Sequence, residues 1–246
     1  MTRLIDIRDK KLIYYLSLNA RTSYSALAKQ LNLSKNAVKY RAERLRRLGI
    51  IQKYACVVNI GAIKAETFDM MLRFNEDIYA TEDILGFFKK NDAVTWLVTL
   101  SGEWDMLVEF VFKDILHFKS IISGTLSHFG QRLDSYKVFL PRDILRVEHL
   151  ISDFYQELNM KSIPRDHRTQ EKHDLDKVDR EILSVLNEDS TLPLLDIAKK
   201  LDLTIDIVRY RIRKLSENKI IIKFFPEISL QKLGYTEYLF VIKLRN

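Results

Sequence analysis

The first 60 residues alternate apolar and polar positions with the period of an α-helix, interrupted by short turns. Residues 8–18 predict an amphipathic helix. Its apolar face is formed by Leu12, Ile13 and Leu16. A second, short helix is expected to end at Leu31, and a third to run from an N-cap at Ser34 to Gly49, a residue typical of helix C-termini. The β-rich run Ile50–Asn59 then fits the wing of a winged helix-turn-helix module.

The same pattern returns near the end of the chain. Residues 6–75 align with residues 176–245 at a constant offset of 170 residues, without a gap. Identical residues lie in the helices, turns and strand of each copy: Asp6 and Asp176, Asp9 and Asp179, Leu16 and Leu186, Ala28 and Ala198, Leu31 and Leu201, Tyr40 and Tyr210, Arg41 and Arg211, Ile50 and Ile220. A chance match between two helical periods would not preserve the polar residues and every loop length. The sequence therefore predicts two copies of one module.

The segment between the copies follows a different pattern, in which short β-rich runs alternate with two helical stretches. The expected order is a strand at 67–75, a helix at 81–90, strands at 94–100 and 106–112, a helix at 115–129 and a strand at 133–140. A tight turn, Ser101–Asp105, joins the two middle strands as a hairpin. This order, β-α-β-β-α-β, predicts a ferredoxin-like domain.

These patterns together predict an α+β multidomain protein. The expected domains are a winged helix-turn-helix at 1–60, a ferredoxin-like sensor and oligomerisation domain at 61–141, a connecting helix and polar linker at 142–174, a second winged helix-turn-helix at 175–235, and the first strand of an incomplete second sensor domain at 236–246. Two alternatives stay open for the last strand: the sequence is a fragment of a longer chain, or the strand pairs with an exposed sheet edge elsewhere.

Composition narrows the class of protein. Of the 246 residues, 47% are hydrophobic and 30% charged, which is typical of a soluble globular protein. The net charge of +7 favours an anionic partner only weakly, since basic residues also serve solubility. The single cysteine, Cys56, excludes an internal disulfide and a cysteine-based metal cluster. The N-terminus lacks a signal-peptide pattern, and no apolar run is long enough to span a membrane, so a cytoplasmic protein with no membrane partner and no cofactor or metal is expected.

The third helix carries the clearest chemistry. Residues 35–47 contain six cations and one anion, and the apolar residues Val38, Ala42 and Leu45 share the opposite side. A DNA recognition helix needs this layout, with hydrogen-bond donors for base edges and cations for phosphates. The expected DNA-binding residues are Ser34, Lys35, Asn36, Lys39, Tyr40, Arg41, Arg44 and Arg47. For Arg41 a second role stays open, that of bracing the fold through a nearby carboxylate.

The third helix of the second copy has different residues at its N-terminal end. Ile205, Asp206 and Ile207 stand where the first copy has Lys35, Asn36 and Ala37, so that end has lost one cation and gained an anion. The expected DNA-binding residues of this copy are Arg209, Tyr210 and Arg213. The sequence predicts a module that binds mainly phosphates or reads a different sequence, with a purely structural role as the alternative.

The chain resembles the Lrp/AsnC (feast/famine) transcription regulators. The resemblance rests on Asp9, on the third-helix pattern Ser34-x3-Val38-x2-Arg41-x3-Leu45-x3-Gly49-Ile50-Ile51, on the Asn59–Lys64 segment, and on the turn Ser101-Gly102-Glu103-Trp104-Asp105. It implies a regulator of double-stranded DNA that assembles as a homodimer or larger oligomer through its ferredoxin-like domain. Family members bind amino acids or similar small effectors near that turn, so Gly102 and Asp105 become effector-binding candidates. A structural turn is the alternative reading of both residues.

Two other functions compete with this reading. Some proteins that resemble the family are decarboxylases of sirohaem-type tetrapyrroles, and two-module chains occur among them. The sequence places His117 and His128 on one helix and the other histidines outside the sensor domain, and shows no metal-ligand spacing or nucleophile–base set. A protein-binding adaptor without DNA affinity is the third possibility. The basic third helix favours a transcription regulator over an enzyme.

Overall fold

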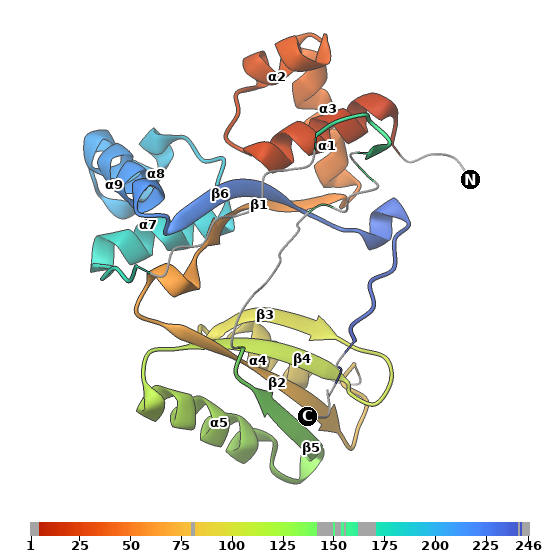
Figure 1. Ribbon diagram of the computed structural model, residues 1–246, viewed down its shortest axis with the longest axis vertical. Helices are drawn as coiled ribbons and strands as arrows, with labels where there is room; N and C mark the ends of the chain where they lie inside the picture. Colours follow the sequence, from red (N-terminus) through yellow and green to blue (C-terminus); the bar gives the residue numbers. More distant parts are fainter. Residues whose placement is uncertain are drawn as a thin grey trace. The chain divides into compact units, whose positions relative to one another are not determined.

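A computed structural model describes residues 5–79, 82–141, 150, 154, 156–161, 171–240 and 242 (Figure 1). The chain forms two compact units. The first unit comprises the described residues of Met1–Asn59, Arg146–Arg168 and Leu175–Asn246, and it therefore contains both copies of the repeated module. The second unit comprises those of Ile60–Leu145 and Thr169–Asp174, and it contains the central segment.

Each copy of the repeat folds as three helices. In the first copy these are α1 (Ile7–Leu18), α2 (Tyr24–Leu31) and α3 (Lys35–Arg47). In the second they are α7 (Lys177–Glu188), α8 (Leu194–Leu201) and α9 (Ile205–Glu217). The expected apolar faces are buried: Leu12, Ile13 and Leu16 on α1, and Val38, Ala42 and Leu45 on α3. The turn into the third helix is also shared, because Asn32 and Asp202 both adopt a left-handed conformation, with φ of 50° and 53°.

The strand that follows each third helix pairs with the strand of the other copy. β1 (Ile51–Val58) and β6 (Ile221–Ile228) form a two-stranded antiparallel sheet (Figure 1). Its central pair is Ala55 opposite Phe225, and these two residues are equivalent in the repeat. An antiparallel ladder centred on equivalent residues is a local two-fold symmetry. The sequence predicted the strands, but it did not show that the two copies complete one another.

Contacts outside the ladder obey the same symmetry. The backbone N–H of Ala20 donates to the carbonyl of Phe224 at 2.9 Å, and the equivalent Ser190 N–H donates to Tyr54 at 2.7 Å. Helix α1 packs against β6 and α7 against β1, so the first helix of each copy covers the strand of the other. The described residues Leu150, Phe154 and Leu158 are buried in the core of the first module. The two modules are thus joined through their strands and their first helices within this unit.

The second unit has the expected ferredoxin-like arrangement. Its strands are β2 (Glu66–Phe74), β3 (Val94–Thr99), β4 (Met106–Phe112) and β5 (Leu133–Phe139), and its helices are α4 (Glu82–Lys89) and α5 (Ile115–Phe129). The strands form one antiparallel sheet in the order β3-β4-β2-β5. Alternate residues face the two helices and form the core: Phe68, Met70, Leu72, Phe74, Ile84, Phe88, Met106, Val108, Phe110, Ile121 and Phe129. Short 3₁₀ helices lie at Ile60–Ala62, Gly130–Arg132 and Gln231–Leu233.

The connecting segment and the last strand were expected in the second half of the chain. Most of the connecting helix expected at 142–160, and most of the linker at 161–174, lie outside the described residues. The strand expected at 236–246 does not form in residues 236–240, which have no regular secondary structure. Tyr238 and Phe240 there are 77% and 79% exposed. A β-prone run forms a strand only where a neighbouring strand accepts its hydrogen bonds, and this segment has no such neighbour among the described residues. In the part of the chain that is described, no helix is long and apolar enough to cross a membrane.

The side of the sheet away from α4 and α5 carries a pair of acids. Asp69 on β2 lies directly opposite Glu109 on β4, and Glu109 lies opposite Trp96 on β3. Burial, with a further contribution from the negative charge of Glu109, raises the pKa of Asp69 to about 6. At neutral pH this pair therefore destabilises the second unit.

Replacing Asp69 by Asn should stabilise the second unit at pH 7 and not at pH 4. The folded state binds the Asp69 proton more tightly than the unfolded chain, whose carboxyl has the ordinary pKa of 3.8. The penalty is absent below that pKa, grows between about pH 4 and 6, and is constant above. Because solvent screens this half-exposed group, we expect a gain below about 2 kcal/mol. Thermal unfolding of parent and Asp69→Asn at both pH values measures it, and an equal effect at the two values would contradict the assignment.

Candidate DNA-binding surface

Helix α3 separates its apolar and polar residues cleanly. Ser34 caps it, since its hydroxyl accepts a hydrogen bond from the backbone N–H of Ala37 at 3.1 Å. Five predicted DNA-binding side chains are exposed on this helix: Lys35, Asn36, Lys39, Tyr40 and Arg47. The side chain of Lys39 is 60% exposed, and its pairing with Glu43, at 3.8 Å, is a weak surface contact that leaves the ammonium available.

Two of the predicted DNA-binding arginines are held by acids of α1. Arg41 Nη1 lies 2.7 Å from Asp9 Oδ1 and 2.8 Å from Asp6 Oδ2, and Arg44 Nη1 lies 2.9 Å from Asp9 Oδ2. The side chain of Asp9 is fully buried, so its charge depends on these guanidinium groups. Desolvation acts to raise the pKa of Asp6, but the Asp9 backbone N–H and Arg41 outweigh it and hold that pKa below its usual value. Arg41 thus has the bracing role left open by the sequence, and Arg44 shares it.

The second module repeats the brace. Arg211 Nη1 lies 2.5 Å from Asp176 Oδ2 and 3.2 Å from Asp179 Oδ1. The backbone N–H of Asp179, followed by the Arg211 guanidinium, holds the pKa of Asp176 below its usual value. The brace keeps α1 on α3, and α7 on α9, in both copies. Because both copies contain this ion pair, it belongs to the shared fold of the module and not to the DNA-contacting surface of one copy.

The exposed side of α9 differs from that of α3. Arg209 forms an ion pair with Asp206, and Arg213 lies 3.8 Å from Glu217. Ile207 is 41% exposed and Tyr210 is 50% exposed. The predicted residues Arg209, Tyr210 and Arg213 therefore share one surface, but its N-terminal end offers apolar atoms and a carboxylate where α3 offers an ammonium and an amide.

The two surfaces are related by the symmetry of the β1–β6 sheet. Helix α3 packs on β1 and α9 packs on β6, so the two-fold that relates the strands also relates the helices. B-DNA has two-fold axes of its own, and paired helix-turn-helix modules use them by placing one helix in each of two major-groove segments.

The predicted effector residues lie at the turn between β3 and β4. Gly102 is exposed and has a φ of 138°, a conformation that L side chains rarely adopt. Asp105 Oδ2 accepts a hydrogen bond from the backbone N–H of Phe74 at 2.8 Å. That carboxylate therefore ties the turn to β2, which is the structural role named as the alternative. Within the described ranges, no three His, Cys, Asp or Glu side chains gather into a group that could hold a metal ion.

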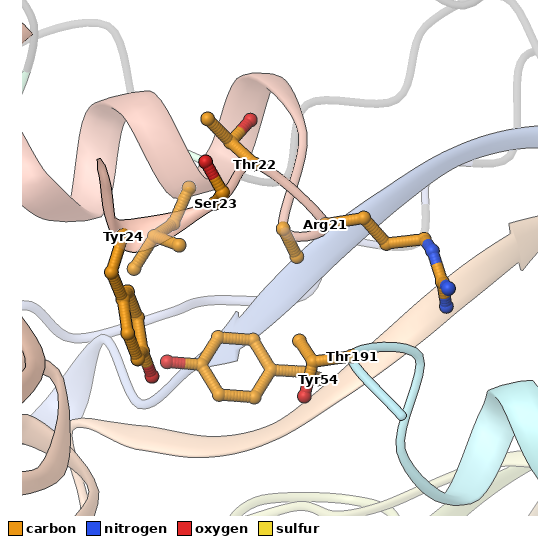
Figure 2. A pocket seen from close by; sticks show the side chains of 8 residues that line it. Arg21, Thr22, Ser23, Tyr24, Tyr54 and Thr191 are labelled. Atoms are coloured by element: carbon orange, nitrogen blue, oxygen red, sulfur yellow. The ribbon is translucent and has the colours of Figure 1, made fainter. Parts of the chain in front are cut away.

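The sequence analysis did not identify a polar cavity beside the start of α2. Figure 2 shows this cavity, of about 240 Å³, with the side chains of Arg21, Thr22, Ser23, Tyr24, Tyr54 and Thr191 around it. A signal was present in the repeat. At the positions of Thr22, Ser23, Tyr24 and Tyr54, the second copy has the residues Leu192, Pro193, Leu194 and Phe224. A cluster of polar residues confined to one copy is not required by the shared fold.

Two family models match the chain. A winged helix-turn-helix DNA-binding model matches residues 5–52, and an AsnC-type helix-turn-helix domain model matches residues 175–216. The two matches fall on the two copies of the repeat, over the helices α1–α3 and α7–α9. Both copies thus resemble DNA-binding domains independently.

Similar proteins include regulators and one enzyme. An uncharacterized HTH-type transcriptional regulator of Pyrococcus furiosus is 32% identical over 111 residues, which cover 44% of this chain and 74% of the relative. The structure of E. coli AsnC is similar with a TM-score of 0.50 at 18% identity, over 59% of this chain and 97% of that one. The siroheme decarboxylase NirDL is similar with a TM-score of 0.57 at 13% identity, over 90% of this chain and 65% of that one. The two structural likenesses show a shared fold.

Removing the brace should cost stability, whereas removing an exposed arginine should not. Arg41→Ala leaves the buried Asp9 carboxylate with Arg44 and the backbone N–H of Asp6 as partners, so we expect a loss of about 2–4 kcal/mol in the free energy of unfolding. Arg47→Ala is the matched control, because Arg47 is exposed and forms no ion pair among the described residues, and it should change stability by less than about 0.5 kcal/mol. Denaturant unfolding measures both, and equal losses would refute the distinction.

Proposed function

Because the chain belongs to the Lrp/AsnC family of helix-turn-helix transcription regulators, we propose that its two modules bind double-stranded DNA together, as a pair joined by β1 and β6. The observation that carries this proposal is the two-fold pairing of equivalent strands around Ala55 and Phe225. It gives one chain the symmetric pair of recognition helices that DNA-binding dimers obtain from two subunits.

In the first module, α3 enters the major groove with its N-terminal half. Asn36 suits adenine and Lys39 suits guanine, since these side chains match the hydrogen-bonding edges of those bases. Tyr40 contacts a phosphate or a thymine methyl group. Lys35 and Arg47 neutralise phosphates at the two ends of the helix. Ser34, Arg41 and Arg44 act indirectly, by capping and bracing the helix.

In the second module, α9 contributes less affinity and a different preference. Arg209, Tyr210 and Arg213 are exposed and reach phosphates. The exposed Ile207 offers an apolar surface to thymine methyl groups, and Asp206 offers an acceptor to the amino group of cytosine. The two half-sites are therefore expected to differ in sequence, and the first module supplies most of the binding free energy.

An amino acid or a similar small effector is proposed to bind near Gly102 and Asp105. One oxygen of Asp105 is committed to the Phe74 N–H, which leaves the other carboxylate oxygen for a ligand ammonium. The chain is proposed to have no enzymatic activity and to work in the cytoplasm. The fold that it shares with NirDL carries no activity by itself, because unrelated functions recur on one fold.

Lys39→Ala should weaken binding to a selected DNA site by about 1–3 kcal/mol and relax specificity at one base pair. Arg47→Ala should weaken binding to all sequences alike and reduce the slope of log affinity against log salt by about one phosphate contact. The control is Lys89→Ala, which removes an exposed cation from α4 in the other unit and should change neither quantity. Fluorescence anisotropy over a series of salt concentrations measures all three proteins. Parental affinity in both α3 variants would rule out α3 as the recognition helix.

A second copy of the chain is proposed to pack against β3 on the sheet side that faces away from α4 and α5, where Trp96 is exposed. Trp96 on that side is 50% exposed, beside the half-buried Val98. Light scattering of the full chain at micromolar concentration should report a dimer or larger, and Trp96→Lys should shift the equilibrium to the monomer while the chain stays folded. A monomeric parent, or a variant with unchanged mass, would refute this assembly.

A further inference from the structure

The cavity at the start of α2 contains a buried hydroxyl without a partner. Tyr54 is only 4% exposed, and its Oη has no hydrogen-bond partner among the described residues. In Figure 2 this hydroxyl points across the cavity toward Tyr24. Burial raises the pKa of Tyr54, so the phenol stays protonated and can donate a hydrogen bond. A buried hydroxyl that makes no hydrogen bond destabilises the folded state.

The second copy shows that the fold does not need this hydroxyl. Phe224 occupies the position of Tyr54 on the opposite strand, where it is half-buried against the core of the first module. Leu194 likewise replaces Tyr24, and Pro193 replaces Ser23. The apolar version of this corner is thus compatible with the same module. The first copy therefore retains a buried hydroxyl without a hydrogen bond, whereas the second copy has no such group. This difference points to a role of the Tyr54 hydroxyl other than folding.

The positive charge of Arg21 beside the cavity favours a negatively charged ligand. The half-buried Arg21 donates to the carbonyl of Ser190 through Nη1, and its guanidinium lies 5.4 Å from the Phe224 ring centroid. Burial lowers the pKa of Arg21, and the negative charge of Asp189 offsets part of that shift, so the guanidinium stays charged beside the cavity. The eight-residue helix α2 begins here at Tyr24, and the first N–H groups of a helix favour an anion as well.

The cavity is partly open to solvent, and its size suits a small ligand. About 240 Å³ corresponds to about eight water molecules, which suits a molecule of similar heavy-atom count. The walls combine a cation and a helix N-terminus with two phenols and the apolar side chains of Leu16 and Ala20. A carboxylate fits the cationic end, and a hydroxyl, carbonyl or amino group fits the phenols.

We propose that this cavity, lined by Arg21, Ser23, Tyr24 and Tyr54 of the first module and Thr191 of the second, binds a small carboxylic acid the size of an amino or hydroxy acid. The carboxylate lies between Arg21 and the start of α2, and the Tyr54 hydroxyl donates to the second polar group. Because Thr191 belongs to the other module, the ligand bridges the two copies within the first unit. The site is separate from the turn at Gly102 and Asp105 and does not depend on DNA binding.

The test uses the full chain and a panel of compounds: the standard amino acids, lactate, malate and pyruvate, with acetate as the minimal carboxylate and inorganic phosphate as a competing anion. At least one of the two-group acids should bind saturably in calorimetry and raise the melting temperature, more than acetate or phosphate does. The variant Tyr54→Phe, which installs the residue of the second copy, should lower affinity at least about tenfold. Without ligand it should melt at the parental temperature or above, because the unpartnered hydroxyl is gone.

Two controls separate this site from others. Asp105→Asn, at the turn of the second unit, and Tyr40→Phe, an exposed tyrosine on α3, should both keep the binding. Tyr24→Phe is a second cavity variant and should weaken it as Tyr54→Phe does. A panel without a binder would overturn the proposal. So would binding that survives both cavity variants, or binding that is lost in Asp105→Asn.

Discussion

The pairing of β1 with β6 is the interaction on which the arrangement of the first unit depends. Neither strand could be stable alone, since a single strand leaves its backbone hydrogen-bonding groups unpaired. Each copy of the repeat supplies the strand that pairs with the strand of the other copy. In addition, α1 of the first copy packs on β6 of the second, and α7 of the second copy packs on β1 of the first. The symmetry of the ladder then fixes where α3 and α9 lie relative to one another. One set of hydrogen bonds thus determines how the two copies of the repeat are joined.

The two copies share a symmetric backbone fold, but the side chains on their exposed helices and around the cavity differ. The braces Arg41–Asp9 and Arg211–Asp179 are equivalent and hold each recognition helix in the same place. Differences between the copies occur where side chains are not needed for that fold. They lie at the N-terminal ends of α3 and α9, and around the cavity that contains Tyr54. Duplication followed by divergence at such positions keeps the shared fold while giving each copy its own surface.

Local patterns in the sequence predicted the helices well, because amphipathic period, capping residues and turn residues are properties of short segments. Ser34 and Gly49 bounded α3 correctly, and the six elements of the second unit formed in the predicted order. Contacts between segments distant in the sequence were harder to predict. A β-prone run shows that a strand can form but not which strand it joins, and so the β1–β6 ladder was not foreseen. Arg44 was assigned to DNA from its charge and its position on the flank of the third helix, and the sequence did not show that Asp9, 35 positions away, accepts its hydrogen bond.

The central claim is that the two modules contact DNA as one symmetric pair. Selection of bound sequences from randomised duplex oligonucleotides by the full chain tests it most directly. The account predicts a bipartite site, with two inverted half-sites at one fixed spacing and with unequal sequences, because α3 and α9 are related by the β1–β6 two-fold but carry different residues. A single half-site with no constraint beside it, or two half-sites at variable spacing, would contradict the claim.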